Sequence, residues 1–251
     1  MTGRDTTIPS RLRAIPRALG WRRLVSGGLS ALLPSLAIGN PTGGEVVAGI
    51  AAISNPEAGT TVIDQASNSA VINWQTFSIG GQEFVIFNQP SASSVALNRV
   101  LGGDPSEILG NLSANGRVFL VNPMGVLFGD GARVDVGGLV ATTMDIADED
   151  FLAGNYAFAG NSPAAVRNDG VIAANNGFVV LSGDHVSNTG LIESVSGSVI
   201  LAAAGGITLD IDNSGLVSYT LDTAALSELA GVENLGQHHG CLLYTSPSPR
   251  D

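Results

Sequence analysis

The sequence predicts an all-β protein and, within that class, a parallel β-helix with an N-terminal cap and small excursions from its coils. The first observation is an internal repeat, because residues 166–172 (Val-Arg-Asn-Asp-Gly-Val-Ile) match residues 186–192 (Val-Ser-Asn-Thr-Gly-Leu-Ile) at a period of about 20. The second is that short β-branched or apolar runs alternate with Asn-Gly, Asp-Gly or Ser-Gly turn signals. The third is that no helical pattern lies between these runs, which excludes the crossover helices of a doubly wound sheet.

The composition supports a packed protein of this class. Of 251 residues 33 are Gly, while 13% are charged and 44% are apolar. The apolar fraction is too high for a disordered chain, the Gly content is too high for a coiled coil, and no apolar stretch reaches the roughly 20 residues that span a bilayer. A β-sandwich is the alternative fold, but its strands would alternate apolar and polar residues, whereas these runs are nearly continuously apolar.

Residues 1–37 have the order of a secretory signal peptide. Six of the 11 Arg residues lie within the first 23 positions, an apolar stretch covers residues 24–38, and small residues alternate at its end. We expect cleavage after Ala37 or Gly39; a basic amphipathic helix on a membrane surface is the alternative. The chain beyond residue 37 keeps five Arg against 21 acidic residues, so we expect no nucleic-acid partner.

The β-helix domain is expected from residue 40 to residue 236, with its cap directly after Asn40. Residues 71–74, 83–87 and 117–121 are its next strands, and residues 40–221 leave room for roughly nine coils. Residues 142–165 form an excursion with a short helix at 144–152, capped by Asp145 or Asp148, and residues 156–158 (Tyr-Ala-Phe) continue this excursion. Residues 211–217 (Ile-Asp-Asn-Ser-Gly-Leu-Val) read as a third copy of the repeat.

Asn168 and Asn188 occupy equivalent positions in the two clearest copies of the repeat. We therefore expect them at the same corner of adjacent coils. Side-chain amides placed in this way can hydrogen-bond to one another in a ladder, which is a structural role.

The chain is expected to end in a tail, residues 237–251. Within it, residues 241–251 (Cys-Leu-Leu-Tyr-Thr-Ser-Pro-Ser-Pro-Arg-Asp) resemble translated sequencing-adaptor sequence. On this interpretation the chain is a fragment of a longer exported protein. Cys241 is the only Cys and allows no internal disulfide, so a large hydrogen-bonded core must hold the exported chain together.

Neither a catalytic site nor a metal or cofactor site is expected. His185 is the only His before residue 238, so His and Cys ligands cannot gather around a metal. The acids that could cleave a glycan are Asp130 with Asp135, and the acidic run at residues 145–150. A solvated loop explains the first set and a helix start explains the second, so we expect no enzyme.

The middle of the chain carries a family resemblance. Residues 98–100 (Asn-Arg-Val) and 114–126 (Ala-Asn-Gly-Arg-Val-Phe-Leu-Val-Asn-Pro-Met-Gly-Val) closely resemble the N-terminal secretion domain of filamentous haemagglutinin-like exoproteins. These exoproteins are the passengers of two-partner secretion (TPS) in Gram-negative bacteria. Segments at 72–74, 77–80, 136–141 and 151–156 fit the same pattern, so the resemblance covers about residues 40–235. Family members often have Asn-Pro-Asn-Gly-Ile where this chain has Met124 and Val126 at the third and fifth positions.

The resemblance implies a right-handed β-helix with a targeting role. In the family, the signal peptide takes the domain across the inner membrane, and the POTRA domains of a TpsB-type outer-membrane β-barrel transporter recognise it in the periplasm. The domain then folds outside and templates the solenoid that follows, so the expected location is the cell surface or the medium. The longer protein would be a haemagglutinin or adhesin, and its missing C-terminal part would bind host-cell or glycan receptors.

The residues that we assign to secretion form the motif Asn122-Pro123-Met124-Gly125, with Asn98 and Arg99 as second choice. Two interpretations stay open: Asn122 contacts the transporter, or the motif only forms a tight turn that shapes one coil. A glycan-binding or glycan-cleaving β-helix module is the alternative function. It is disfavoured because aromatic residues, the usual glycan platforms, are scarce at 2 Trp, 3 Tyr and 8 Phe.

Overall fold

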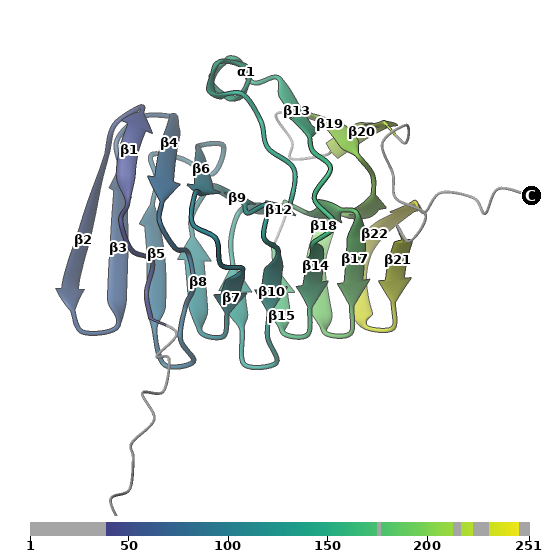
Figure 1. Ribbon diagram of the computed structural model, residues 1–251, viewed down its shortest axis with the longest axis horizontal. Helices are drawn as coiled ribbons and strands as arrows, with labels where there is room; N and C mark the ends of the chain where they lie inside the picture. The colour runs from purple at the N-terminus through teal and green to yellow at the C-terminus, as the bar shows by residue number, and fades with distance from the viewer. Residues whose placement is uncertain (1–38, 175–176, 213–216, 223–230, 246–251) are drawn as a thin grey trace, which may run out of the picture. The chain divides into compact units, whose positions relative to one another are not determined.

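The computed structural model describes residues 39–174, 177–212, 217–222 and 231–245, all within one compact unit, Leu36–Asp251. Nearly all of its regular structure is β-strand, arranged as a parallel β-helix of about six coils (Figure 1). The predicted fold class is therefore confirmed. The predicted signal peptide, residues 1–37, lies outside the described residues, as do residues 246–251 of the predicted tail.

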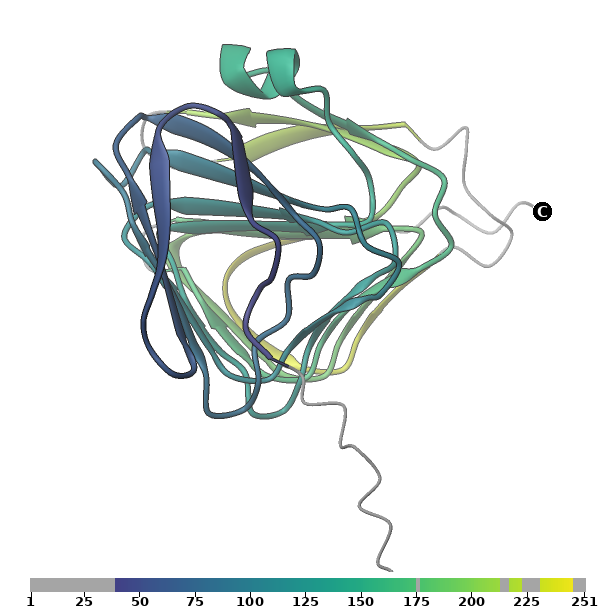
Figure 2. The same cartoon turned by 60° about the vertical axis from the view of Figure 1, so that its left-hand side comes forward.

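Each regular coil places one strand on each of three faces, and Figure 2 shows this triangular arrangement. The first face holds β4 (Ser69–Trp74), β6 (Val95–Val100), β9 (Arg117–Val121), β12 (Gly138–Thr142) and β16 (Phe178–Gly183). The second face holds β3 (Thr60–Gln65), β5 (Phe84–Asn88), β8 (Asn111–Ala114), β11 (Arg133–Asp135) and β15 (Val171–Ala173). The third face holds β7 (Ser106–Ile108), β10 (Val126–Phe128), β14 (Ala165–Asn168), β17 (His185–Asn188) and β21 (Gly231–Asn234).

One long strand joins the first two faces into a single sheet. β18 (Leu191–Ala203) pairs with β15 on the second face and with β16 on the first face. β22 (Gln237–Thr245) pairs with β18 in parallel along both parts. Backbone pairing therefore continues to Thr245, past residue 236 where we expected the β-helix domain to end.

The coils begin with an antiparallel cap at the predicted place. β1 (Glu45–Ala48) pairs antiparallel with β4, and β2 (Ala51–Glu57) pairs antiparallel with β3. The antiparallel strands β1 and β2 cover the open edges of the first coil and so end the parallel stack.

The prediction of about nine coils is wrong, because many residues lie outside the regular coils. The cap, the segment between β12 and β14, and the segment that follows β18 all depart from them. The early coils are also longer than the period of the repeat, since Ser69 of one coil lies opposite Val95 of the next.

The first excursion contains the predicted helix as α1 (Asp148–Ala153), and the residues that continue it form the strand β13 (Tyr156–Ala159). The expected cap is wrong, because Ala147 is the N-cap residue of α1 and makes no side-chain capping bond. Asp148 lies inside the first helical turn, where a negative charge is favourable. In the described part of the chain, no helix is long and apolar enough to cross a membrane.

The second excursion follows β18, and it shows that the prediction of a third copy of the repeat is wrong. β19 (Gly206–Ile211) and β20 (Val217–Asp222) form an antiparallel pair, in which Ile211 lies opposite Val217. Ile211 and Val217, the two ends of that segment, therefore pair with each other outside the coils, and residues 213–216 between them lie outside the described residues. β13 pairs antiparallel with β19 and completes a three-stranded sheet.

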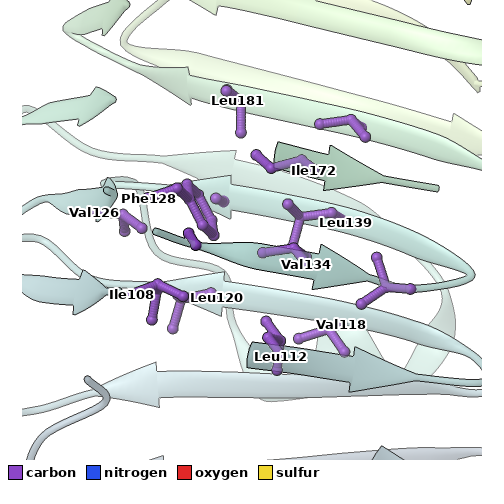
Figure 3. Close-up of a cluster of buried hydrophobic side chains, with 14 of the residues drawn as sticks. Ile108, Leu112, Val118, Leu120, Val126, Phe128, Val134, Leu139, Ile172 and Leu181 are labelled. Atoms are coloured by element: carbon purple, nitrogen blue, oxygen red, sulfur yellow. The ribbon is translucent and has the colours of Figure 1, made fainter. Parts of the chain in front are cut away.

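Strand β9 shows why the apolar runs are nearly continuous. Val118 and Leu120 point into the interior of the coils, where they join the first core drawn in Figure 3. Phe119 and Val121 point outward into a second core, to which α1, β13 and β19 contribute Phe151, Phe158 and Ile207. A strand that is buried on both sides needs apolar residues at successive positions.

Candidate functional site

The motif Asn122-Pro123-Met124-Gly125 forms a tight turn at the corner between β9 and β10. The backbone N–H of Gly125 donates to the carbonyl oxygen of Asn122 at 3.0 Å, and the N–H of Met124 donates to Asn122 Oδ1 at 2.8 Å. Pro123 restricts φ at the second turn position. Gly125 has a φ of 109°, which a residue with a Cβ adopts only under strain. The motif residues are therefore those that this turn requires.

Asn122 is completely buried and connects three successive coils. Its Nδ2 donates to the carbonyl oxygen of Asp104 and to Oγ of Ser106 in the preceding coil, both at 3.0 Å. Its backbone N–H donates to the carbonyl oxygen of Thr142 in the following coil at 3.0 Å. Since its side-chain oxygen accepts from Met124, the folded domain uses both ends of the amide. A partner of the folded domain cannot reach this side chain.

The exposed residues of the motif are Pro123 and Met124. Met124 is 48% exposed and lines an open pocket of about 370 Å³ together with Pro105, Leu127 and Arg167. The pocket beside the folded motif is therefore lined by apolar residues together with the charged residues Arg167 and Asp169.

Asn98 on β6 is buried and links three strands of the first face. Its Oδ1 accepts a hydrogen bond from Nε1 of Trp74 on β4 at 3.0 Å. Its Nδ2 donates to the carbonyl oxygens of Ala96 at 3.2 Å and of Phe119 on β9 at 3.3 Å. A buried amide with these partners stabilises the pairing of β4, β6 and β9.

Arg99 reaches from β6 to the start of α1 and to the residues directly before it. Its Nε lies 2.8 Å from Oδ1 of Asp145, and its NH1 lies 2.7 Å from Oδ1 of Asp148. NH2 also donates to the carbonyl oxygen of Ile146. Burial alone would lower the pKa of Arg99, but the hydrogen bonds and charges of the two carboxylates outweigh it and raise this pKa above its ordinary value.

The structure brings both predicted motifs together. β6 and β9 are neighbours, and Arg99 lies opposite Val121, the residue directly before Asn122. We call the six residues 98–99 and 122–125 the motif site.

The two repeat asparagines lie at a different corner, between the third and second faces. Asn168 Nδ2 donates to Asn188 Oδ1 at 2.8 Å, and Asn188 Nδ2 donates to Asn234 Oδ1 at 2.9 Å. Asn168 ends β14 opposite Phe128, the far end of β10 from the motif turn. Sequence reasoning missed Asn234, although residues 232–236 (Val-Glu-Asn-Leu-Gly) keep the Asn and the Gly of the repeat.

A second stack of amides, which was not predicted, lies at the corner between the second and first faces. Gln89 Nε2 donates to Gln65 Oε1 at 3.1 Å. The side chain of Asn115 accepts from the backbone N–H of Gln89 and donates to its carbonyl oxygen, both at 2.7 Å. Gln65 and Gln89 are 24 positions apart, and Gln89 and Asn115 are 26 apart, which is close to the length of one early coil. This spacing is the sequence signal that could have predicted the stack.

The acids considered for glycan cleavage have other surroundings. Asp145 and Asp148 bind Arg99, and Asp130 and Asp135 are exposed in and beside a loop. Within the described ranges, no group of three or more His, Cys, Asp or Glu is placed to hold a metal ion.

Comparison with known families shows whether the domain belongs to a family of secretion domains or of glycan-cleaving enzymes. The sequence model of the TPS secretion domain matches residues 38–238. The chain belongs to the TPS secretion-domain family. This is a family of secretion domains of exoproteins, not of enzymes, and the motif site lies within the matched TPS domain.

Solved structures of TPS domains share the fold. The crystal structure of the HMW1 secretion domain from Haemophilus influenzae matches with a TM-score of 0.71 and 32% identity, over 79% of this chain and 53% of that one. The filamentous hemagglutinin secretion domain matches with a TM-score of 0.54 and 15% identity, over 82% and 78% of the two chains, which shows the fold alone.

Two relatives are much longer than this TPS domain. A heme/hemopexin-binding protein of Haemophilus influenzae (strain ATCC 51907 / DSM 11121 / KW20 / Rd) is 48% identical over 106 residues, which are 42% of this chain and 12% of that protein. A second heme/hemopexin-binding protein of Haemophilus influenzae is 45% identical over 102 residues, 41% of this chain and 11% of that protein. The matched part therefore spans about one tenth of the length of these relatives.

Proposed function

We propose that this TPS domain directs the export of a longer protein through a TpsB-type outer-membrane β-barrel, whose periplasmic POTRA domains recognise it. The observation that carries the proposal is the match of the TPS family model over residues 38–238. Proteins of this family are exported across the outer membrane to the cell surface or the medium, and we propose the same location here.

The burial of Asn122 bears on when recognition takes place. Its side chain is inaccessible once the turn has formed. A transporter that contacts Asn122 must therefore do so before the coil folds. On this proposal the POTRA domains bind the extended motif, and closure of the turn outside the cell withdraws Asn122 from the transporter.

Folding outside the cell also gives the movement a direction. With a single Cys, the chain has no internal disulfide that would block passage of an unfolded segment. Each coil that stacks on a formed one gains ladder hydrogen bonds and buried surface without a new nucleation step. A folded coil is too wide to return through the pore. Because each new coil stacks on a formed one, the domain would also template the coils that follow.

For the longer protein we propose a surface adhesin of the haemagglutinin type, which binds host-cell or glycan receptors through residues outside this domain. The relatives are named heme/hemopexin-binding proteins, so binding of heme or hemopexin is the alternative activity for the longer protein. Binding of the full-length protein to host cells or to hemopexin would separate the two.

The test is a secretion assay with and without the cognate barrel, comparing medium and periplasm. The chain should appear in the medium only when the barrel is present. Export without a barrel, or retention in both cases, would contradict the proposal, and the domain would then be tested for glycan binding and cleavage.

Variants of the motif refine this assay. Asn122→Ala with Pro123→Ala should abolish export, whereas Asn88→Ala, which removes only an exposed hydrogen bond to Asp64, should not. Fluorescence of the buried Trp74 in the purified variant reports whether the coils form. Lost export with retained folding supports recognition of the motif, and loss of both shows a purely structural role.

A further inference from the structure

Residues 143–164, which we call the strap, leave the coils after β12 and return at β14. The start of the strap lies against Arg99. The Arg99 side chain is only 12% exposed and binds the carboxylates of Asp145 and Asp148 at 2.8 and 2.7 Å. Arg99 therefore fixes the position of the first residue of α1, Asp148, against strand β6.

The end of the strap lies against the motif turn. Ser162 Oγ donates a hydrogen bond to the carbonyl oxygen of Pro123, and it accepts one from the N–H of Ala164 at 3.2 Å. A Cβ built on Gly125 would lie 3.1 Å from the carbonyl oxygen of Ala165, so the returning chain passes close to the turn. The turn thus positions the residues that lead into β14.

The middle of the strap packs on the strand that leads into the motif. The ring of Phe119 on β9 lies 5.9 Å from Phe151, 5.1 Å from Tyr156 and 5.9 Å from Phe158, measured between centroids. These distances are typical of favourable aromatic pairs. The strap is therefore held at both ends by polar contacts and at its centre by aromatic contacts.

From these contacts we infer that the two halves of the motif site act together as a fastener for the strap. Arg99 holds one end and Pro123 the other, and Asp145, Asp148 and Ser162 are the positioning residues through which they act. The fastener keeps α1 and β13 over the outer side of the first face and thereby closes the second core.

The order of the chain supports this role. The motif site precedes the strap in the sequence, whereas β19, the pairing partner of β13, follows it. When the strap docks on the motif site, Tyr156 and Phe158 are placed to pair with Leu209 and Ile207. The fastener thus prepares the edge on which the hairpin β19–β20 completes the outer sheet.

Hydrogen exchange on the purified full chain tests the inference. The double variant Asp145→Asn with Asp148→Asn should raise amide exchange in residues 143–160 by about tenfold or more, while β5, β8 and β11 keep their protection. Ser162→Ala should raise exchange near residues 158–164. Asp130→Asn and Ser187→Ala, at exposed and half-exposed positions away from the strap, are the matched controls. Exchange in the strap that equals the controls, or that rises equally in every strand, would overturn the fastener.

A charge exchange separates an ion-pair role from a packing role. Arg99→Asp should free the strap, and adding Asp148→Arg should restore slow exchange at least in part. Absence of any restoration in a variant whose Trp74 remains buried would contradict the pair as the fastening contact.

The link to export rests on the proposed function and is tested apart from it. The same variants enter the secretion assay with the barrel present. If export requires the docked strap, variants with a freed strap will export less, and unchanged export would refute that requirement. Export that never depends on the barrel would instead refute the proposed function and leave the exchange result standing.

Discussion

A Cβ atom built on Gly177 would overlap the carbonyl oxygen of Gly137 in the neighbouring coil, and Gly197 stands in the same relation to Gly177. The three glycines stack at the corner between the second and first faces. In the early coils the same corner holds the amide stack of Gln65, Gln89 and Asn115. The backbones of the later coils therefore approach so closely at this corner that only hydrogen fits between them.

Gly177→Ala is expected to lower the free energy of unfolding by about 1–3 kcal/mol, because the coils must separate locally to admit the methyl group. Urea denaturation followed by Trp74 fluorescence measures the change. The control is Gly103→Ala, since a Cβ built on Gly103 meets no atom within 4 Å. Equal midpoints for the two variants would contradict the stacked corner.

Asn188→Ala should destabilise the domain by about 1–3 kcal/mol, because it removes the hydrogen bonds that join Asn188 to the buried amide of Asn168 and to the partly buried amide of Asn234. Asn188 donates to Asn234 and accepts from Asn168, so one substitution breaks two contacts. Ser187→Ala on the same strand is the control. If the ladder carries no stability, the two variants will unfold at the same urea concentration.

Phe119→Ala should cost about 3–5 kcal/mol, the range for removing a buried aromatic side chain. Phe119 is fully buried, and three aromatic residues of the strap lose their common partner. Phe84→Ala is the matched control, because Phe84 is 45% exposed. Thermal unfolding of both variants checks the prediction, and a larger loss for Phe84→Ala would refute it.

Asp169 should titrate below the ordinary range of an aspartate. Burial alone would raise its pKa, but hydrogen bonds from Arg167 at 2.8 Å and from Thr189 at 2.6 Å, with the charge of Arg167, lower it. A lowered pKa means that the carboxylate contributes stability above its unfolded pKa, and that this contribution is lost as pH falls through the folded pKa.

Arg167→Ala should therefore raise the pKa of Asp169 and move the loss of this contribution to higher pH. NMR titration of the carboxyl carbon measures the shift, with Arg133→Ala as the control. An unchanged midpoint in Arg167→Ala would show that Thr189 alone holds the carboxylate.

The regular part of the fold could be predicted from the sequence because its signals are local. Residues 166–201 repeat their apolar, Asn and Gly positions, and the structure pairs Val166 with Val186 and Asn168 with Asn188 in parallel. The same logic failed for residues 211–217, because an Asn-Ser-Gly sequence is compatible with a hairpin as well as with a coil corner, and Ile211 pairs antiparallel with Val217.

The contacts of the motif site could be predicted only in part. The turn at residues 122–125 follows from Asn-Pro and Gly, which act within four residues. The partners of Arg99 could not be read from the sequence, because Asp145 and Asp148 lie in the strap, 46 or more residues away, and resemble a helix start. The wrong capping prediction has the same cause: Asp145 is engaged with Arg99, and its backbone lies before the helix.

The hairpin β19–β20 and the strap change how this β-helix comes apart. A bare solenoid contacts only its nearest repeats and frays one coil at a time from an open end. Here β19, which follows the late strand β18, pairs with β13, and β13 belongs to the strap that Arg99 holds against the early strand β6. Early and late coils therefore share one outer layer. The domain is expected to melt in a single all-or-none transition, so that once folded it has no partly unwound state from which it could be drawn back.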